Sequence, residues 1–79
     1  MMSLGYSFNL VNANKEADGR HPGVKLGRHC IAKDISVRRA AEYFGVSRMT
    51  IYKWFVGEWY PRNAHALRIK EVLQSDVSL

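Results

Sequence analysis

The sequence predicts an all-α fold of four or five helices, preceded by a short N-terminal β-strand arm. Three observations support this fold: helical spacing of apolar residues from residue 21 onward, serine and glycine at positions that start and end helices, and strict alternation confined to residues 3–11. Because 79 residues supply one small core, we expect an arm and loop over residues 1–20 and a helical domain over residues 21–79.

The N-terminal arm is predicted from the alternation of apolar and polar side chains in residues 3–11, which is the period of a half-buried strand. Residues 12–20 are polar and contain many turn formers, so we expect a loop there. The apolar face of the strand consists of Leu4, Tyr6, Phe8 and Leu10.

A lone strand needs a partner, because its backbone groups are otherwise unpaired in water. Apart from the short tail at residues 76–79, nothing else in the sequence resembles a strand. The four apolar arm residues therefore predict a homodimer, in which they form an antiparallel ribbon between two subunits. The alternative is an arm that packs loosely on its own domain or is disordered.

The helical part begins with His-Pro-Gly at residues 21–23, where proline suits a first helical turn. A first helix is expected over residues 24–33, because its apolar residues share one face. Ser36 is a suitable N-cap for a second helix, in which four apolar residues cluster within a narrow arc. They are Val37, Ala40, Ala41 and Phe44.

The second helix is expected to end at Gly45, which tolerates a left-handed backbone. Ser47 is again a natural N-cap, so residues 48–56 are predicted to form a third helix. Two short helices joined by a three-residue turn that contains glycine outline a helix-turn-helix. A fourth helix is expected over about residues 62–74.

The third helix has two different faces. Ile51, Trp54 and Phe55 lie within about 100° of one another and are expected in the core. The opposite side combines cations, a phenol and adaptable apolar groups, which suit the edges of base pairs. The plain alternative is an ordinary solvated face. The residues of this side are Arg48, Met49, Tyr52, Lys53 and Val56.

Charge and composition restrict the classes of partner. Twelve Lys and Arg stand against seven Asp and Glu, and the net charge of +5 would attract a polyanion, although a basic membrane-surface module would look the same. The single cysteine, Cys30, cannot form an intramolecular disulfide. The sequence has no apolar run of about 18 residues and no secretory leader, so we expect a soluble, cytoplasmic protein without membrane contact.

The segment SVRRAAEYFGVSRMTIYKWFVG, residues 36–57, resembles the helix-turn-helix of the Cro/cI (xenobiotic-response-element) family of bacterial and phage regulators. Its small and apolar residues match the positions that lock the two helices of this family together. Residues 21–23 and 66–69 (ALRI) resemble the HigA-like antitoxin branch, which is paired with ribonuclease toxins of the HigB type. The spacing W-x-x-G-x-x-x-P, from Trp54 to Pro61, is closer to phage Cro-like repressors.

The resemblance implies double-stranded DNA as the partner and assigns site residues by position. Base contacts are expected from Arg48, Met49, Tyr52 and Lys53. Phosphate contacts, which set register and orientation, are expected at the starts of the second, third and fourth helices. The residues concerned are Ser36, Arg38, Ser47, Arg62 and Asn63.

The expected function is that of a dimeric repressor, from a phage or mobile element, that recognises an inverted repeat with its third helix in the major groove. One alternative is an antitoxin that also neutralises a toxin protein. Another is a protein-interaction module that uses the aromatic surface from Trp54 to Tyr60 and does not bind DNA. Within that surface, Trp59 and Tyr60 are expected to pack over the small core; the alternative is contact with phosphate.

Catalysis is not expected. His21, His29 and His65 are scattered along the chain, and no pair of them has the spacing of metal ligands. Cys30 reads as a small core residue, and the few carboxylates form no acid and base pair. We therefore expect no enzyme activity, no metal and no cofactor.

Overall fold

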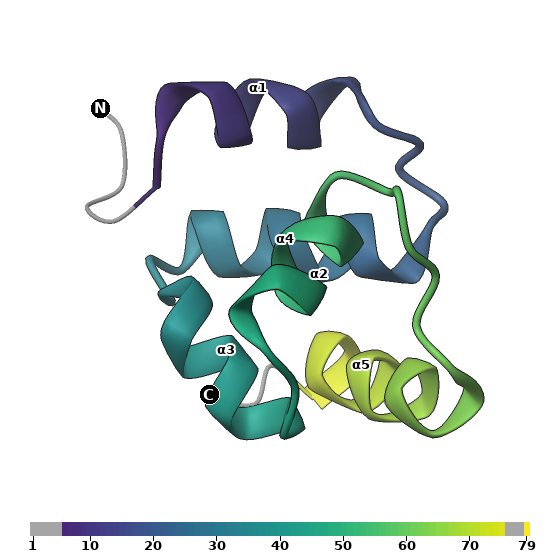
Figure 1. The fold of residues 1–79 in the computed structure, drawn as a ribbon. Helices are drawn as coiled ribbons and strands as arrows, with labels where there is room; N and C mark the ends of the chain where they lie inside the picture. The colour runs from purple at the N-terminus through teal and green to yellow at the C-terminus, as the bar shows by residue number, and fades with distance from the viewer. Residues whose placement is uncertain (1–5, 76–78) are drawn as a thin grey trace.

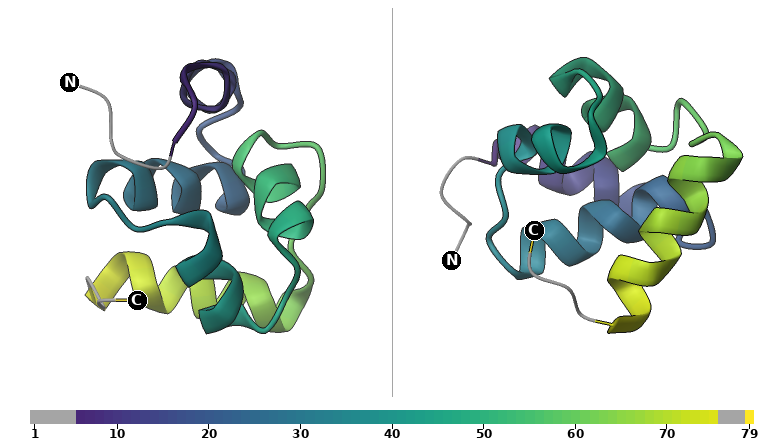
Figure 2. Two further views of the ribbon diagram at one scale, coloured as in Figure 1. Left: turned by 60° about the vertical axis from the view of Figure 1, so that its left-hand side comes forward. Right: turned by 90° about the horizontal axis from the view of Figure 1, so that it is seen from below.

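The computed structural model describes residues 6–75 and 79, and within these residues the chain forms five α-helices and no strand (Figure 1). Helix α2 is central, because it contacts α1, α4 and α5, while α3 packs on α4. Figures 1 and 2 show α1 and α5 on opposite sides of α2. The helices are α1 (Phe8–Glu16), α2 (Pro22–Ala32), α3 (Val37–Phe44), α4 (Arg48–Phe55) and α5 (Asn63–Ser75).

The predicted β-strand arm is wrong for the described residues, since Phe8–Glu16 forms helix α1. The physical reason is that Ser7 starts a helix, which the alternation of apolar and polar side chains does not reveal. Ser7 is the N-cap, and its Oγ accepts a hydrogen bond from the Leu10 N–H at 3.1 Å. Part of the predicted loop, residues 12–16, therefore continues the helix.

The predicted intersubunit ribbon is not formed by its described members. Tyr6 is buried in its own chain, where its hydroxyl donates a hydrogen bond to the Ile35 carbonyl and its ring stacks on Phe55. Burial raises the pKa of the Tyr6 hydroxyl well above its usual range. Phe8 is exposed, Leu10 is half-buried against the core, and Leu4 lies outside the described residues.

Helix α1 is fixed to the rest of the fold by one buried amide. The Asn14 side chain is fully buried, and its Nδ2 donates to the Val24 carbonyl at 3.2 Å and the Phe55 carbonyl at 2.7 Å. A Cβ on Gly27 would lie only 2.6 Å from this Nδ2, so glycine permits the close approach. The amide thus joins α1, α2 and α4.

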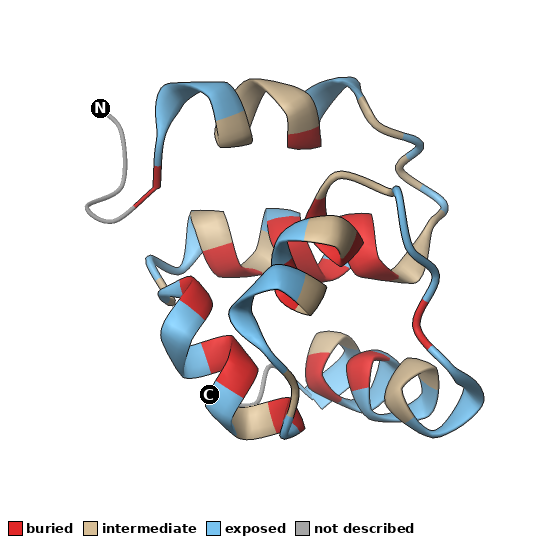
Figure 3. Cartoon of the chain, in the orientation of Figure 1, coloured by how far each residue is buried: buried red, intermediate tan, exposed pale blue. Residues whose placement is uncertain are grey.

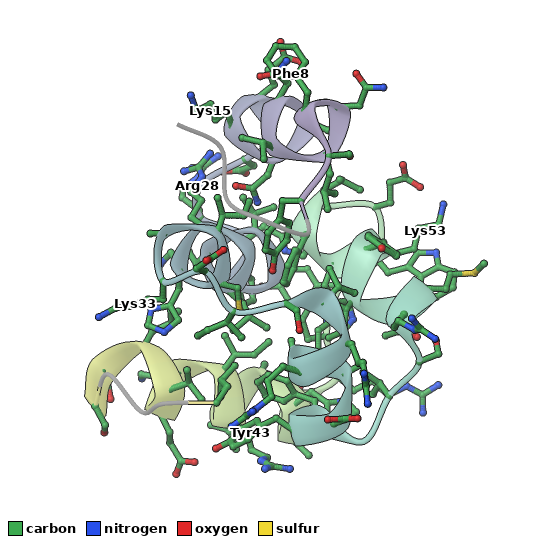
Figure 4. The ribbon with its side chains drawn as sticks, turned by 90° about the vertical axis from the view of Figure 1, so that its left-hand side faces the viewer. Phe8, Lys15, Arg28, Lys33, Tyr43 and Lys53 are labelled. Atoms are coloured by element: carbon green, nitrogen blue, oxygen red, sulfur yellow. The ribbon has the colours of Figure 1, made fainter. Side chains whose placement is uncertain are left out.

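Arg28 makes a second connection between α1 and α2, which Figure 4 shows between these helices. Its Nη2 donates to the carbonyls of Asn14, Lys15 and Ala17 at 3.3, 3.1 and 3.0 Å. A cation at this end of a helix also complements the negative end of the helix dipole. Arg28 therefore has a structural role at the end of α1.

The predicted N-caps Ser36 and Ser47 are confirmed, whereas α2 begins at Pro22, two residues before the start predicted at residue 24. His21 caps α2 with its Nδ1, which accepts hydrogen bonds from the N–H groups of Gly23 and Val24 at 3.0 and 3.4 Å. Ser36 caps α3 through the Arg39 N–H at 3.1 Å, and Ser47 caps α4.

The buried faces of the helices meet in one core, shown in red in Figure 3. Cys30 is fully buried there, and burial raises the pKa of its thiol to about 12. Trp59 and Tyr60, by contrast, are 47% and 68% exposed, so the prediction that they cover the core is wrong. The buried residue of this connection is Pro61, while Tyr60 packs on the His21 ring at a centroid distance of 4.7 Å.

Candidate nucleic-acid interface

The turn between α3 and α4 consists of Gly45, Val46 and Ser47. Gly45 has a φ of +68°, a left-handed conformation that glycine adopts without a Cβ penalty. The Val46 N–H donates to the Ala41 carbonyl at 3.0 Å and the Gly45 N–H to the Glu42 carbonyl at 3.3 Å, the two bonds of a Schellman motif. Val46 packs against the core, so the turn holds the two helices in a fixed arrangement.

Helix α4 has the two faces that its sequence predicts. Ile51, Trp54 and Phe55 are at most 3% exposed, and the Trp54 ring packs edge-on against Phe44 at a centroid distance of 5.8 Å. On the other face, Met49 and Tyr52 are 61% and 43% exposed, and Arg48 is also exposed. The solvent-facing side chains are thus a cation, a thioether and a phenol within the first turns of α4.

Lys53 differs from the other predicted base-contacting residues because it has a partner within the chain. It is half-buried, and its Nζ lies 2.7 Å from Glu58 Oε1. Figure 4 shows Lys53 on the side of α4 that points away from α2. The Lys53 ammonium group is therefore paired with the Glu58 carboxylate at the edge of the exposed face of α4.

The chain reversal after α4 brings Glu58 to Lys53. Gly57 has a φ of +80°, and the Glu58 N–H donates to the Lys53 carbonyl at 2.9 Å. Sequence reasoning missed this pair because residues five apart are not neighbours on a helix. The signal that could have found it is Gly57, which predicts a turn directly after the helix.

Three of the predicted DNA-contacting residues line one hollow of about 420 Å³ between α3 and α4. Arg38 comes from the first turn of α3, and Ser47 and Arg48 come from the start of α4. The Arg38 Nε lies 3.4 Å from Glu42 Oε2, in an exposed pair one helical turn apart. Such a pair is weak and leaves the guanidinium accessible to a stronger anion.

The other predicted phosphate-contacting residues lie outside this hollow. Ser36 lines a separate small hollow together with Arg39, and Arg62 lines a hollow of about 500 Å³ beside Trp59. Asn63 is exposed as the first residue of α5. Arg38, Ser47 and Arg48 are therefore grouped, whereas Ser36, Arg62 and Asn63 each line a different hollow.

Sequence reasoning also missed Thr50. Its N–H donates to Ser47 Oγ at 3.1 Å, its Oγ1 lies 3.0 Å from the same atom, and its side chain lines the hollow that contains Arg62. A polar residue three positions after an N-cap serine is the signal that points to such a pair.

The described parts of the chain contain neither a metal site nor a membrane-spanning helix. No group of three or more His, Cys, Asp and Glu residues there could hold a metal ion. Of the helices formed by residues 6–75, none has the length and apolar character needed to cross a membrane.

A family model described as a helix-turn-helix, Psq domain, matches residues 28–59. The matched segment runs from the second half of α2 through α3, the turn and α4. The comparisons with curated proteins and with solved structures find no match. The chain thus carries a helix-turn-helix segment similar to a DNA-binding family, and the match indicates sequence-specific DNA binding. It does not favour the Cro/cI family or its antitoxin branch in particular.

The Glu58→Gln variant is expected to bind random duplex DNA about twofold to fivefold more tightly than the wild type, since an exposed ion pair of up to about 1 kcal/mol no longer restrains Lys53. If Lys53 then contacts a phosphate, the slope of log K against log salt steepens by about 0.9. Fluorescence anisotropy across a salt series measures both quantities. Glu71→Gln removes an exposed carboxylate from α5 and serves as the control. An equal gain in both variants would attribute the effect to net charge alone.

Proposed function

We propose that this protein is a dimeric transcriptional repressor that places α4 in the major groove of an inverted-repeat operator. The observation that supports the proposal most is the exposed face of α4, where Arg48, Met49 and Tyr52 point to solvent while the opposite face is buried. In a helix-turn-helix that binds DNA, the second helix lies in the major groove, where its exposed side chains contact the base edges.

Each exposed side chain of α4 can contact a base edge whose hydrogen-bonding groups or methyl group suit its chemistry. Arg48 can donate two hydrogen bonds to O6 and N7 of guanine, Tyr52 can donate to or accept from a base, and Met49 can contact a thymine methyl group. Lys53, held by Glu58, is placed for the phosphate backbone or for a base at the edge of the site. Sequence preference is therefore assigned chiefly to Arg48, Met49 and Tyr52.

Phosphate contacts are proposed around α4. Arg38 and Ser47 border the same hollow as Arg48, so they can contact the backbone on one side of the groove. The start of α3, capped by Ser36, offers N–H groups and a partial positive charge to a phosphate oxygen. Arg62 and Asn63 do the same at the start of α5.

The Arg62→Ala variant is expected to weaken binding to operator and random DNA by the same factor. Arg62 is exposed and lies outside the face of α4, so its expected contact is to phosphate and carries no sequence information. The loss of one such contact lowers the salt slope by about 0.9. Arg20→Ala, which removes an exposed arginine paired with Asp18, is the control. A loss confined to the operator would assign Arg62 to base recognition instead.

A dimer is proposed because one eight-residue helix contacts few base pairs. Two copies on a two-fold axis would bind half-sites about 34 Å apart, one turn of DNA. Sedimentation velocity of the full chain with and without operator DNA distinguishes a preformed dimer from one that assembles on DNA. One chain bound per operator at saturation would contradict the dimer.

The function is tested by titrating the full chain into the duplex upstream of its own gene and into a shuffled duplex of equal length. A repressor that controls its own promoter should prefer the upstream duplex by at least about a thousandfold at physiological salt. If the folded chain retards neither duplex at low salt, control of its own promoter is excluded.

A second candidate is a protein-interaction module, and one observation favours it. Trp59 and Tyr60 expose 47% and 68% of their surface beside the hollow of about 500 Å³ that contains Arg62. Exposed tryptophan, tyrosine and arginine are enriched at the energetic centres of protein interfaces. If Trp59→Ala leaves DNA binding unchanged but abolishes a protein contact, this surface serves a separate function.

A further inference from the structure

A second surface lies outside the helix-turn-helix. Helix α5 and the start of α2 border a groove of about 680 Å³, and no residue of α4 lines it. The α5 residues that line it are mostly spaced by three and four, so they form one face over three turns, about 16 Å long. They are Asn63, Ala66, Leu67, Ile69, Lys70, Leu73 and Gln74.

The middle of this groove is apolar. Leu67 is 64% exposed, and Leu73 is only partly covered by the core. Pro22 and Tyr60 add apolar surface from the other side, and Tyr60 is 68% exposed. A helix face with exposed leucine next to a groove has the form that binds a second amphipathic helix, with anchors at i, i+3, i+4 and i+7.

The charges at the groove are of one sign. Lys25 and Lys70 line it and are exposed, and among residues 6–75 and 79 no carboxylate lines it. Arg20, which also lines the groove, is paired with Asp18 at 3.2 Å. Two copies of this groove facing each other would bring like charges together, and a basic segment would be repelled for the same reason. Electrostatic complementarity with Lys25 and Lys70 therefore favours a partner segment with acidic side chains.

We propose that this groove binds an acidic amphipathic helix of a partner protein. Its apolar residues would lie against Leu67 and Leu73, and its carboxylates would lie beside Lys25 and Lys70. The groove shares only Asn63 with the proposed phosphate contacts, and no residue of α4 lines it, so a partner held by Leu67, Leu73, Lys25 and Lys70 leaves the exposed face of α4 free for DNA. The proposal does not rest on the proposed repressor function.

The test uses a display library of randomised helical peptides of about 14 residues, long enough for the three turns of the groove. Selection on the full chain should enrich peptides with apolar anchors at helical spacing and an excess of Glu and Asp. Leu67→Ser and Lys70→Glu should each weaken the selected peptides about tenfold or more. Both side chains are exposed, so neither change removes core packing.

Two controls separate the groove from general effects. Ala64→Ser changes an exposed position of α5 outside the groove, and Lys15→Glu makes the same charge change on α1; both should bind the peptides as the wild type does. Operator binding by Leu67→Ser should also be unchanged. Failure to enrich peptides, enrichment of basic peptides, or equal binding by Leu67→Ser would overturn the proposal. Loss of DNA binding in Lys70→Glu with unchanged peptide binding would overturn it in favour of a nucleic-acid contact.

Discussion

The Asn14→Ala variant is expected to lose about 2–4 kcal/mol of unfolding free energy. Asn14 is the only buried polar residue within the described part of the chain, and its Nδ2 holds the carbonyls of Val24 and Phe55. The Phe55 carbonyl lies in the last turn of α4, where helix carbonyls have no partner within their own helix. Removal of the amide leaves this acceptor buried without its partner and detaches α1 from α4.

Chemical denaturation followed by circular dichroism measures this loss. Asn9→Ala is the matched control, because Asn9 belongs to the same helix but is exposed, and its effect should stay within about 0.5 kcal/mol. Similar losses in the two variants would show that the buried amide of Asn14 has no special effect, since alanine favours the helix over asparagine at both positions. An unchanged midpoint for Asn14→Ala would show that α1 does not contribute to the cooperative fold.

The Arg48→Ala variant is expected to lose about 1–3 kcal/mol of binding free energy on the operator and to relax the preference at one base pair. Arg48 is exposed at the first position of α4, next to the turn that fixes this helix on α3. Because its proposed partner is a guanine edge, random DNA should lose much less affinity. Competition titrations with operator and random duplexes measure the ratio directly.

Arg62→Ala provides the comparison for Arg48→Ala, since it removes the same charge outside the exposed face of α4. The two variants should have similar effects on random DNA and different effects on the operator. Equal losses on operator and random DNA for Arg48→Ala would mean that the proposed base-contacting surface is misplaced.

The helix-turn-helix could be predicted from the sequence because local signals determine it. Ser36, Gly45 and Ser47 act through hydrogen bonds and backbone conformations within a few residues of themselves. Ile51, Trp54 and Phe55 share a face by helix geometry alone, and all three are buried as predicted. Local geometry and tertiary packing agree over this segment.

The N-terminal helix could not be predicted in the same way. The alternation of residues 3–11 is compatible with a strand, and the Ser7 cap competes with that pattern. Gly5 precedes the cap and does not decide between the two structures for the residues that follow. Asn14 looks like a loop residue in the sequence, and only its contacts with α2 and α4 explain its burial. The Lys53–Glu58 pair likewise depends on a chain reversal that side-chain periodicity does not encode.

Selection of bound DNA from a random pool by the full chain tests sequence-specific recognition through α4 most directly. The expected result is enrichment of an inverted repeat whose half-sites lie about 34 Å apart, with one base pair losing its preference when Arg48→Ala replaces the wild type. An unenriched pool at low salt, with the chain folded, would contradict sequence-specific binding. An enriched sequence that Arg48→Ala, Met49→Ala and Tyr52→Ala all recognise unchanged would contradict the role of α4.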